Sequence, residues 1–226
     1  MSWLKNPVYK DHIRSVLYIW QGGMESGNAV ADVLSGKVSP SGKLTDTIAC
    51  SLADYPAAND FGDTVRNFYT EDIYVGYRYF ETFCPEKVMY EFGFGLSYSK
   101  FDIEILKAET VTEESKVGGA WGSHGVSIDN GTCAGKEVQI TICVKNTGDC
   151  RGKEVVQVYV QAPQGKLGKP ARELKAFAKT KELAPGEKQE MTLHIPVKNL
   201  ASYDDSGVTG HKSCYVSEAG AYVFHV

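Results

Sequence analysis

The sequence contains no apolar run long enough to cross a membrane, and it shows no excess of positive charge. Its 226 residues carry 24 Lys and Arg against 28 Asp and Glu, which gives a net charge of −4. The basic residues alternate with acids, whereas a nucleic-acid binder usually concentrates them on one face. We therefore expect neither a membrane nor a nucleic acid among the partners of this protein.

The sequence also lacks the cysteine patterns of a metal site. No C-x-x-C pair occurs, and no histidine stands at metal-ligand spacing from any of the six cysteines, Cys50, Cys84, Cys133, Cys143, Cys150 and Cys214. We expect reduced thiols and neither a metal nor another cofactor. The residues after Met1 show no basic start followed by an apolar core, so no secretory signal is visible. These features predict a cytoplasmic location, and the sequon Asn130-Gly131-Thr132 would matter only in a eukaryotic secretory setting.

One stretch, Ser15–Leu44, has the pattern of a strand, a glycine loop and a helix in direct succession. Ser15–Trp20 is a short apolar run that suits a strand buried on both faces. Gly22-Gly23 then ends that strand. A doubly wound sheet needs several such units with helices on both faces, so this single unit predicts a truncated α/β segment.

The helix of this segment is predicted from residue spacing. Val30, Val33 and Leu34 recur at helical intervals, and Gly36 stands where a left-handed C-cap is expected. Pro40 and Gly42 turn the chain after the helix. We then expect a second strand over Lys43–Ile48 and a surface loop over Ser51–Asp63.

From Phe101 onward the apolar residues alternate, as in strands with one buried face. Val138–Lys145 has this pattern, and a turn at Asn146–Asp149 leads to Glu154–Gln161, which we predict to be its antiparallel partner. The insert Thr110–Ala134 is predicted to be a loop. Further strands are predicted over Phe101–Leu106, Arg172–Thr180, Glu190–Ile195 and Ala221–Val226, with a turn at Leu183–Glu187. This series predicts an immunoglobulin-like β-sandwich.

Aromatic residues crowd the region between the two patterns. They include Phe68, Tyr69, Tyr74, Tyr77, Tyr79, Phe80 and Phe83, followed by Phe92, Phe94, Tyr98 and Phe101. Two interpretations are open: a hydrophobic seam that joins two domains, or an exposed platform for sugars. We favour the seam, because most large aromatic side chains are buried.

Stretches from four regions of the sequence, in the same order, resemble parts of glycoside hydrolase family 3, the bacterial β-glucosidases. WQGGMESGNAVADVLSGKVSPSGKL, residues 20–44, is similar to the last strand-helix-strand of that family's α/β-sandwich domain. YTEDIYVGYRYFE at Tyr69–Glu81 resembles its inter-domain connector, and YEFGFGLSYSKF at Tyr90–Phe101 resembles the entry into its C-terminal domain. NTGDCRGKEVVQVYV and ARELKAFAKTKELAPGE, at Asn146–Val160 and Ala171–Glu187, are similar to its fibronectin type III-like domain.

The resemblance implies a mainly β protein in which a truncated α/β segment precedes an immunoglobulin or fibronectin type III-like β-sandwich. Residues 1–60 would be the remnant of the α/β-sandwich domain, 61–100 an aromatic-rich connector, and 101–226 the fibronectin type III-like domain. The implied function is that of the C-terminal part of a retaining β-glucosidase, which supplies structural bracing. Its partners would be the N-terminal TIM barrel, the rest of the α/β-sandwich domain and the β-glucoside or oligosaccharide substrate of the parent enzyme.

In this family the nucleophilic Asp lies on the barrel and the acid/base Glu lies earlier in the α/β-sandwich domain, so no family catalytic residue corresponds to a position in this sequence. The chain alone is therefore predicted to be inactive. The alternative is a stand-alone β-sandwich adhesion or carbohydrate-binding module. Ser15–Leu44 favours the hydrolase, because an independent binding module has no need of a truncated α/β unit.

The remaining candidate groups do not form a catalytic site in the sequence. A retaining glycosidase needs two carboxyl groups roughly 5–5.5 Å apart, whereas Glu25 and Asp32 are two helical turns apart, about 10 Å along the axis. Glu71 and Asp72 are adjacent and would point to opposite faces of an extended chain. Gly22-Gly23 lacks the rest of a phosphate-binding fingerprint. We therefore assign no catalytic, cofactor-binding or metal residue, and interpret Glu25 as a helix-start residue.

The five histidines give no catalytic assignment either. They share no spacing with a serine or cysteine nucleophile, and they stand at His12, His124, His194, His211 and His225. His194 and His225 alternate with apolar residues of their predicted strands. We expect these two side chains on the outer face of the sandwich.

Overall fold

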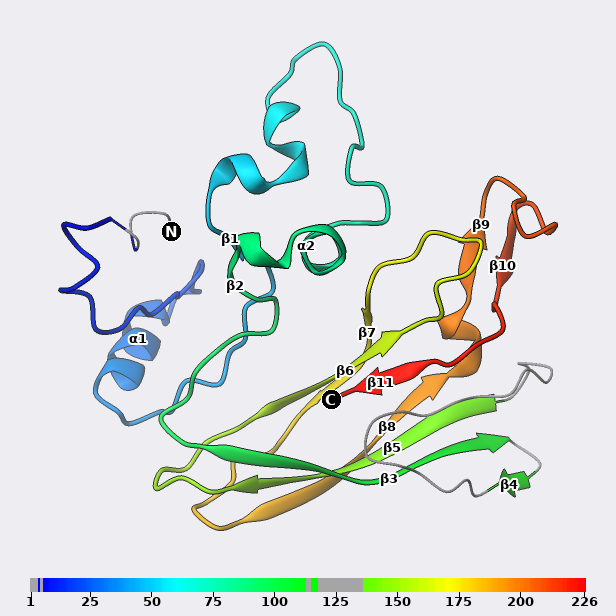
Figure 1. Ribbon diagram of the computed structural model, residues 1–226. Coiled ribbons are helices and arrows are strands. Elements are labelled where there is room, and N and C mark those ends of the chain that lie inside the picture. The colour runs from blue at the N-terminus through cyan, green and yellow to red at the C-terminus, as the bar shows by residue number, and fades with distance from the viewer. Residues whose placement is uncertain (1–3, 5, 113–114, 118–135) are drawn as a thin grey trace. The chain divides into compact units, whose positions relative to one another are not determined.

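The computed structural model describes residue 4 and residues 6–112, 115–117 and 136–226 (Figure 1). It divides into two compact units, Met1–Tyr98 and Ser99–Val226. The chain is mainly β with antiparallel sheets, which confirms the predicted fold class.

Helix α1 of the first unit spans Ser26–Leu34, where the sequence predicts a helix. Glu25 is its N-cap and lies directly before the first turn. The C-terminal end is closed as expected: Gly36 has a φ of +77°, and its N–H donates to the carbonyl oxygen of Val33. None of the helix's own residues is buried.

The two strands expected to flank this helix are largely absent. Ser15–Trp20 lies outside any strand, and its residues are exposed. Of Lys43–Ile48 only Ile48 is in a strand, within β1 (Ile48–Ala49), which pairs antiparallel with β2 (Val88–Tyr90). An apolar run forms a strand only if a neighbouring strand accepts its backbone hydrogen bonds. Within the described residues Ser15–Trp20 has no such neighbour.

A small aromatic cluster forms the core of the first unit. Phe80 is 1% exposed and lies with its ring centroid 5.4 Å from those of Tyr55 and Tyr79, while Ala49 and Cys84 complete the buried set. The loop expected at residues 51–63 carries two short 3-10 helices. The helices around this core are η2 (Leu52–Asp54), η3 (Pro56–Asn59), α2 (Tyr77–Phe83) and η4 (Pro85–Lys87).

The second unit is a two-layer β-sandwich. One sheet has the order β4-β3-β5-β8, and the other has the order β11-β6-β7. The first sheet comprises β3 (Phe101–Thr112), β4 (Ser115–Val117), β5 (Lys136–Asn146) and β8 (Lys188–Pro196). The second comprises β6 (Val155–Gln161), β7 (Glu173–Lys179) and β11 (Val223–His225). A separate hairpin of β9 (Ser202–Asp204) and β10 (Cys214–Val216) follows the 3-10 helix η5 (Val197–Leu200).

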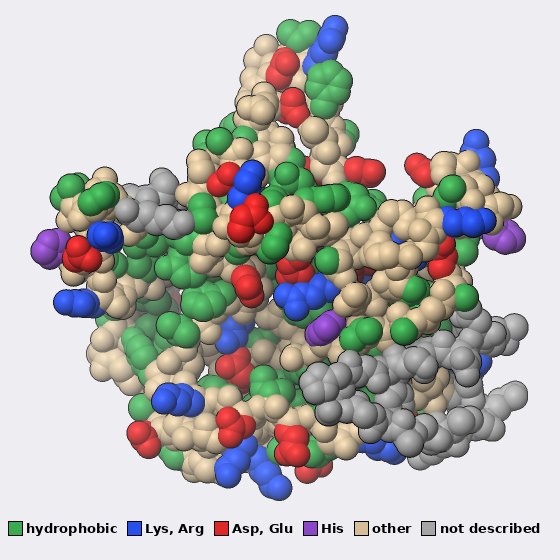
Figure 2. Space-filling view, in the orientation of Figure 1, with side chains coloured by type: hydrophobic (Ala, Val, Ile, Leu, Met, Phe, Trp, Pro, Cys, Tyr) green, Lys and Arg blue, Asp and Glu red, His purple; other side chains and the backbone are tan. Residues whose placement is uncertain are grey.

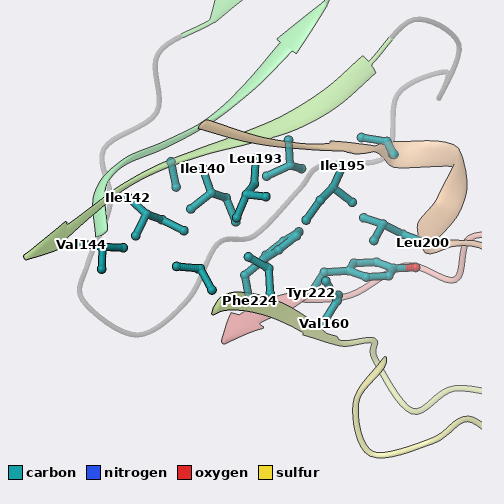
Figure 3. Close-up of a cluster of buried hydrophobic side chains, with 14 of the residues drawn as sticks. Ile140, Ile142, Val144, Val160, Leu193, Ile195, Leu200, Tyr222 and Phe224 are labelled. Atoms are coloured by element: carbon teal, nitrogen blue, oxygen red, sulfur yellow. The ribbon is translucent and has the colours of Figure 1, made fainter. Parts of the chain in front are cut away.

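The core of the sandwich lies between the two sheets, as the alternation in the sequence predicts (Figure 3). On β5 the buried residues are Val138, Ile140, Ile142 and Val144, and on β6 they are Val156, Val158 and Val160. All seven are at most 3% exposed. At roughly 25 cal/mol per Å² of apolar surface removed from water, this core is the main source of stability in the unit.

The predicted pairing of Val138–Lys145 with Glu154–Gln161 is wrong. β5 pairs with β3 and β8, whereas β6 pairs with β7 and β11 in the opposite sheet. Alternation of apolar and polar residues specifies which face of a strand is buried but not which strand lies beside it. The turn after Asn146 therefore carries the chain from one layer to the other instead of closing a hairpin.

The insert predicted to be a loop begins as a strand. β3 continues to Thr112, and β4 pairs with it in the register Thr110 to Val117. The rest of the insert, residues 118–135, lies outside the described residues. His124, the sequon and Cys133 lie there too.

Candidate functional site

The acids of helix α1 have local partners. The side-chain amide of Asn28 donates to Glu25. Asp32 forms an ion pair with Lys37, with 2.9 Å between Nζ and Oδ1. Glu25 stands before the first turn of the helix and Asp32 in its last turn, so the helix holds them apart as the sequence predicts.

The second acidic pair, Glu71 and Asp72, lies in a turn and not in an extended segment. Asp72 has a φ of +48°, and the N–H of Tyr74 donates to the carbonyl oxygen of Glu71. Residues other than Gly, Asn or Asp rarely adopt this left-handed conformation. The backbone conformation of the turn therefore explains why an aspartate stands at position 72.

Gly22 also has a structural explanation. A Cβ at this position would lie 2.1 Å from Cβ of Ser26 in the first turn of α1. A side chain therefore does not fit between the loop and the helix. The glycine requirement arises from this close approach, without any need for a phosphate ligand.

His194 lies on the exposed face of β8, as expected. Its Nδ1 is 3.0 Å from Oε1 of Glu137 on the neighbouring strand β5. The pKa of Glu137 is lowered by hydrogen bonds, first from Gln139 and then from His194. His194, Glu137 and Gln139 thus form a cross-strand contact, and neither of these two hydrogen bonds, both within the described part of the chain, involves a serine or cysteine. Across the described ranges, no group of three or more His, Cys, Asp or Glu side chains is placed to hold a metal ion.

The loop of the first unit that follows η3 (Figure 1) carries large apolar side chains that are exposed (Figure 2). Phe61 is 92% exposed, Val65 85% and Tyr69 89%. The loop is held by polar contacts: Asp63 accepts hydrogen bonds from the N–H groups of Val65 and Arg66, and these bonds lower its pKa. We refer to residues 60–75 as the aromatic loop.

The hairpin β9–β10 is a feature that sequence reasoning missed. Asp204, at the end of β9, has a fully buried side chain, and its carboxylate accepts three backbone N–H groups, from Gly207 at 2.6 Å, Val208 at 3.1 Å and Thr209 at 2.8 Å. The hydroxyl of Thr209 donates at 2.6 Å. These hydrogen bonds, led by that of the Thr209 hydroxyl, lower the pKa of Asp204 to about 2. The Asp-Asp-Ser-Gly run at 204–207 is a turn signal that was available in the sequence.

A buried ion pair holds another connection of the sandwich. Lys169 is 4% exposed, and its Nζ lies 2.5 Å from Oε2 of Glu218 and 2.7 Å from the carbonyl oxygen of Pro163. The same carboxylate accepts the N–H of Lys166, and a Cβ on Gly165 would lie 2.3 Å from it. The hydrogen bond from Lys169 is the main cause that lowers the pKa of Glu218. The loop between β6 and β7 is thereby fixed to the segment before β11.

Two family models match the chain. The glycosyl hydrolase family 3 C-terminal domain matches residues 1–98, and the fibronectin type III-like domain matches residues 154–226. The two matches fall in the first and the second structural unit, respectively.

Curated relatives match nearly the whole chain. A β-glucosidase of Ruminococcus albus is 47% identical over 211 residues, which is 93% of this chain and 20% of the relative. β-Glucosidase A of Butyrivibrio fibrisolvens is 48% identical over 226 residues, which is 99% of this chain and 26% of the relative. The chain thus spans between a fifth and about a quarter of the length of these relatives.

Solved structures agree with these matches. A β-glucosidase from Paenibacillus barengoltzii superposes with a TM-score of 0.86 at 54% identity, over 100% of this chain and 22% of that one. β-Glucosidase 3B from Thermotoga neapolitana, in complex with α-D-glucose, gives a TM-score of 0.75 at 39% identity, over 96% of this chain and 27% of that one.

No helix within the described ranges has the length and apolar character needed to cross a bilayer.

Proposed function

Because the chain belongs to glycoside hydrolase family 3 and corresponds to the C-terminal part of its β-glucosidases, we propose that the whole protein hydrolyses terminal β-linked glucosides. In this proposal the present chain braces the catalytic domains and contributes no nucleophile and no acid/base. The division into an α/β-sandwich remnant at 1–60, a connector at 61–100 and a fibronectin type III-like domain at 101–226 is part of the same proposal.

The observation that carries the bracing role is the exposed apolar surface of the first unit. Ser15–Trp20 is a mostly apolar run in which Ile19 is 54% exposed and Trp20 49%, and helix α1 buries none of its side chains. The aromatic loop adds further exposed rings. Exposed apolar surface of this kind usually marks a protein interface. The relatives are about four to five times longer than this chain, so a parent of similar length has the polypeptide to cover it.

The proposed reaction requires a pair of carboxyl groups, and in this proposal that pair lies outside the present chain. Retention needs a carboxylate nucleophile and a second carboxyl group that acts first as an acid and then as a base. The acids Glu25 and Asp32 are engaged in local contacts. The acidic pair Glu71 and Asp72 lies in a turn whose left-handed backbone at position 72 explains the aspartate. We therefore place both catalytic carboxyl groups, and the pocket that selects the sugar, in the remaining part of the parent protein.

The match of residues 1–98 to a hydrolase domain weakens the case for a stand-alone adhesion or carbohydrate-binding module. A cytoplasmic location belongs to the proposal as well. Its support is the presence of free thiols, with Cys84 and Cys143 buried as small apolar side chains.

The test compares the purified 226-residue chain with the full-length parent on a nitrophenyl β-glucoside. We expect turnover by the parent and none by the chain alone. Absence of turnover by an intact, folded parent on β-linked glucosides would contradict the proposed reaction. Turnover by the chain alone, lost on substitution of one of its own acids, would contradict the bracing role.

A further inference from the structure

Two tyrosines lie directly opposite each other on the hairpin β9–β10. Tyr203 pairs with Tyr215 in the register of the two strands, and their ring centroids are 5.2 Å apart at an interplanar angle of 62°. Tyr203 is 51% exposed and Tyr215 is 75% exposed. The edge-to-face contact between the rings stabilises the hairpin, but it leaves most of the Tyr215 ring open to solvent.

Hydrogen bonds within its connecting loop hold the hairpin that carries these rings in one conformation. The carboxylate of Asp204 binds three successive N–H groups of the connecting loop, and the N–H of Ser213 closes the loop on the carbonyl oxygen of Asp204 at 2.6 Å. Neighbouring residues of a strand point to opposite faces. The tyrosine pair therefore projects from the face opposite to the one that carries Asp204. A ring on a fixed scaffold binds a ligand with little loss of conformational entropy.

The charge of the hairpin narrows the class of ligand. Between Ser202 and Val216 the sequence has two acids, Asp204 and Asp205, against one lysine, Lys212. Exposed rings that stack on nucleic-acid bases are accompanied by a positively charged groove, which this hairpin lacks. A neutral ligand with a flat apolar face and hydroxyl groups at its rim fits an exposed tyrosine, whose ring is apolar and whose hydroxyl is polar. Pyranose sugars have this chemistry.

We propose that Tyr203 and Tyr215 form an auxiliary stacking site for a β-glucan oligosaccharide, separate from the catalytic pocket of the parent. The choice of a β-glucan rests on the proposed function. The site would hold a longer substrate close to the enzyme and so raise its effective concentration, as in other linked binding modules.

The experiment follows the tyrosine ring resonances of the 226-residue chain by NMR during titration with cellotetraose. We expect saturable shifts at Tyr203 and Tyr215. Tyr215→Ala should weaken binding at least tenfold, whereas Tyr215→Phe should retain it. The matched control is Tyr18→Ala, because Tyr18 and Trp20 form a similar exposed pair, 4.5 Å apart at 64°, outside any strand. This control should leave the affinity unchanged.

Absence of saturable shifts, or equal affinity of Tyr215→Ala and the unmodified chain, would overturn the site. So would protection of Tyr215 from nitration by tetranitromethane in the sugar-free parent, since the rings would then lie in a contact between domains. These readings involve no turnover. Their failure is therefore distinct from a failure of the proposed hydrolysis.

Discussion

The hydroxyl of Ser99 donates a 2.6 Å hydrogen bond to Oδ1 of Asn146, and both residues are buried. Asn146 is the last residue of β5, where the chain leaves one sheet for the other. Its Nδ2 donates to the carbonyl oxygens of Cys150 at 2.8 Å and Leu183 at 2.9 Å, and its Oδ1 also accepts the N–H of Gly148. One side chain thus ties together the beginning of the second unit, the crossing turn and the turn before β8.

Asn146→Ala should destabilise the second unit by about 2–4 kcal/mol, because it leaves buried carbonyl groups and the Ser99 hydroxyl without their partner. The measurement is urea unfolding monitored by far-ultraviolet circular dichroism. The control is Lys145→Ala, an exposed change one residue earlier on the same strand. A midpoint for Asn146→Ala equal to that of the control would show that the network adds no stability.

Lys169→Met should cost about 3–5 kcal/mol, because it leaves the Glu218 carboxylate without its counter-charge in a mostly buried site. Lys181→Met is the matched control: it removes a 2.8 Å ion pair with Glu187 in which the lysine side chain is 61% exposed. The control should change stability by no more than about 1 kcal/mol. If the two variants unfold at the same denaturant concentration, the buried ion pair contributes no more stability than the exposed one.

The hairpin β9–β10 should lose order in acid. The folded-state pKa of Asp204 is about 2 and its ordinary value is 3.8. A lowered pKa means that the carboxylate stabilises the fold fully above pH about 4 and loses this effect as the pH falls through about 2. Hydrogen exchange of the Gly207 and Thr209 amides, measured from pH 5 to 2 and corrected for intrinsic rates, should report this loss. In Asp204→Asn the protection should be low throughout and independent of pH.

Hydrogen exchange should also separate the two units of the isolated chain. Amides of Val156–Val160 belong to the core of the sandwich and should exchange slowly. Amides of Val30–Leu34 belong to a helix without a buried residue and should exchange faster by several orders of magnitude. Equal protection of both segments would mean that α1 is held by contacts beyond its own unit's small core.

Glu25→Gln in the full-length parent should leave most of the turnover intact. Glu25 is the N-cap of α1, and in the proposed enzyme the acid/base lies elsewhere. The loss of one negative charge at a helix N-terminus should lower Tm by no more than a few degrees, about 2–4 °C at most. A fall in kcat of a hundredfold or more, with rescue by azide, would instead identify Glu25 as the general acid.

Several elements could be predicted from local sequence because local physics decides them. The alternation in Val138–Lys145 predicts which side chains are buried, and Gly36 predicts the left-handed end of α1. The order of the family motifs predicts the two matched domains. The absence of a carboxylate pair at glycosidase spacing remains a prediction from sequence, because the functional assay is still its test.

Other features were not predicted, because a local pattern does not show which polar groups the fold buries and brings together. Lys169 and Glu218 are 49 residues apart in the sequence, and neither residue lies in a sequence pattern that predicts a buried charge. Asp204 resembles any turn-forming aspartate in sequence, and only the folded loop gathers the N–H groups that lower its pKa.

The sequence by itself determined the buried faces of β5 and β6, the C-terminal end of α1 and the resemblance to β-glucosidases, because periodicity, capping and motif order depend on neighbouring residues. Only the tertiary structure decided that β5 and β6 lie in opposite sheets and that Ser15–Trp20 forms no strand. The physical reason is the same in both cases. A strand exists only with a hydrogen-bonded neighbour, and the identity of that neighbour depends on how the whole chain packs.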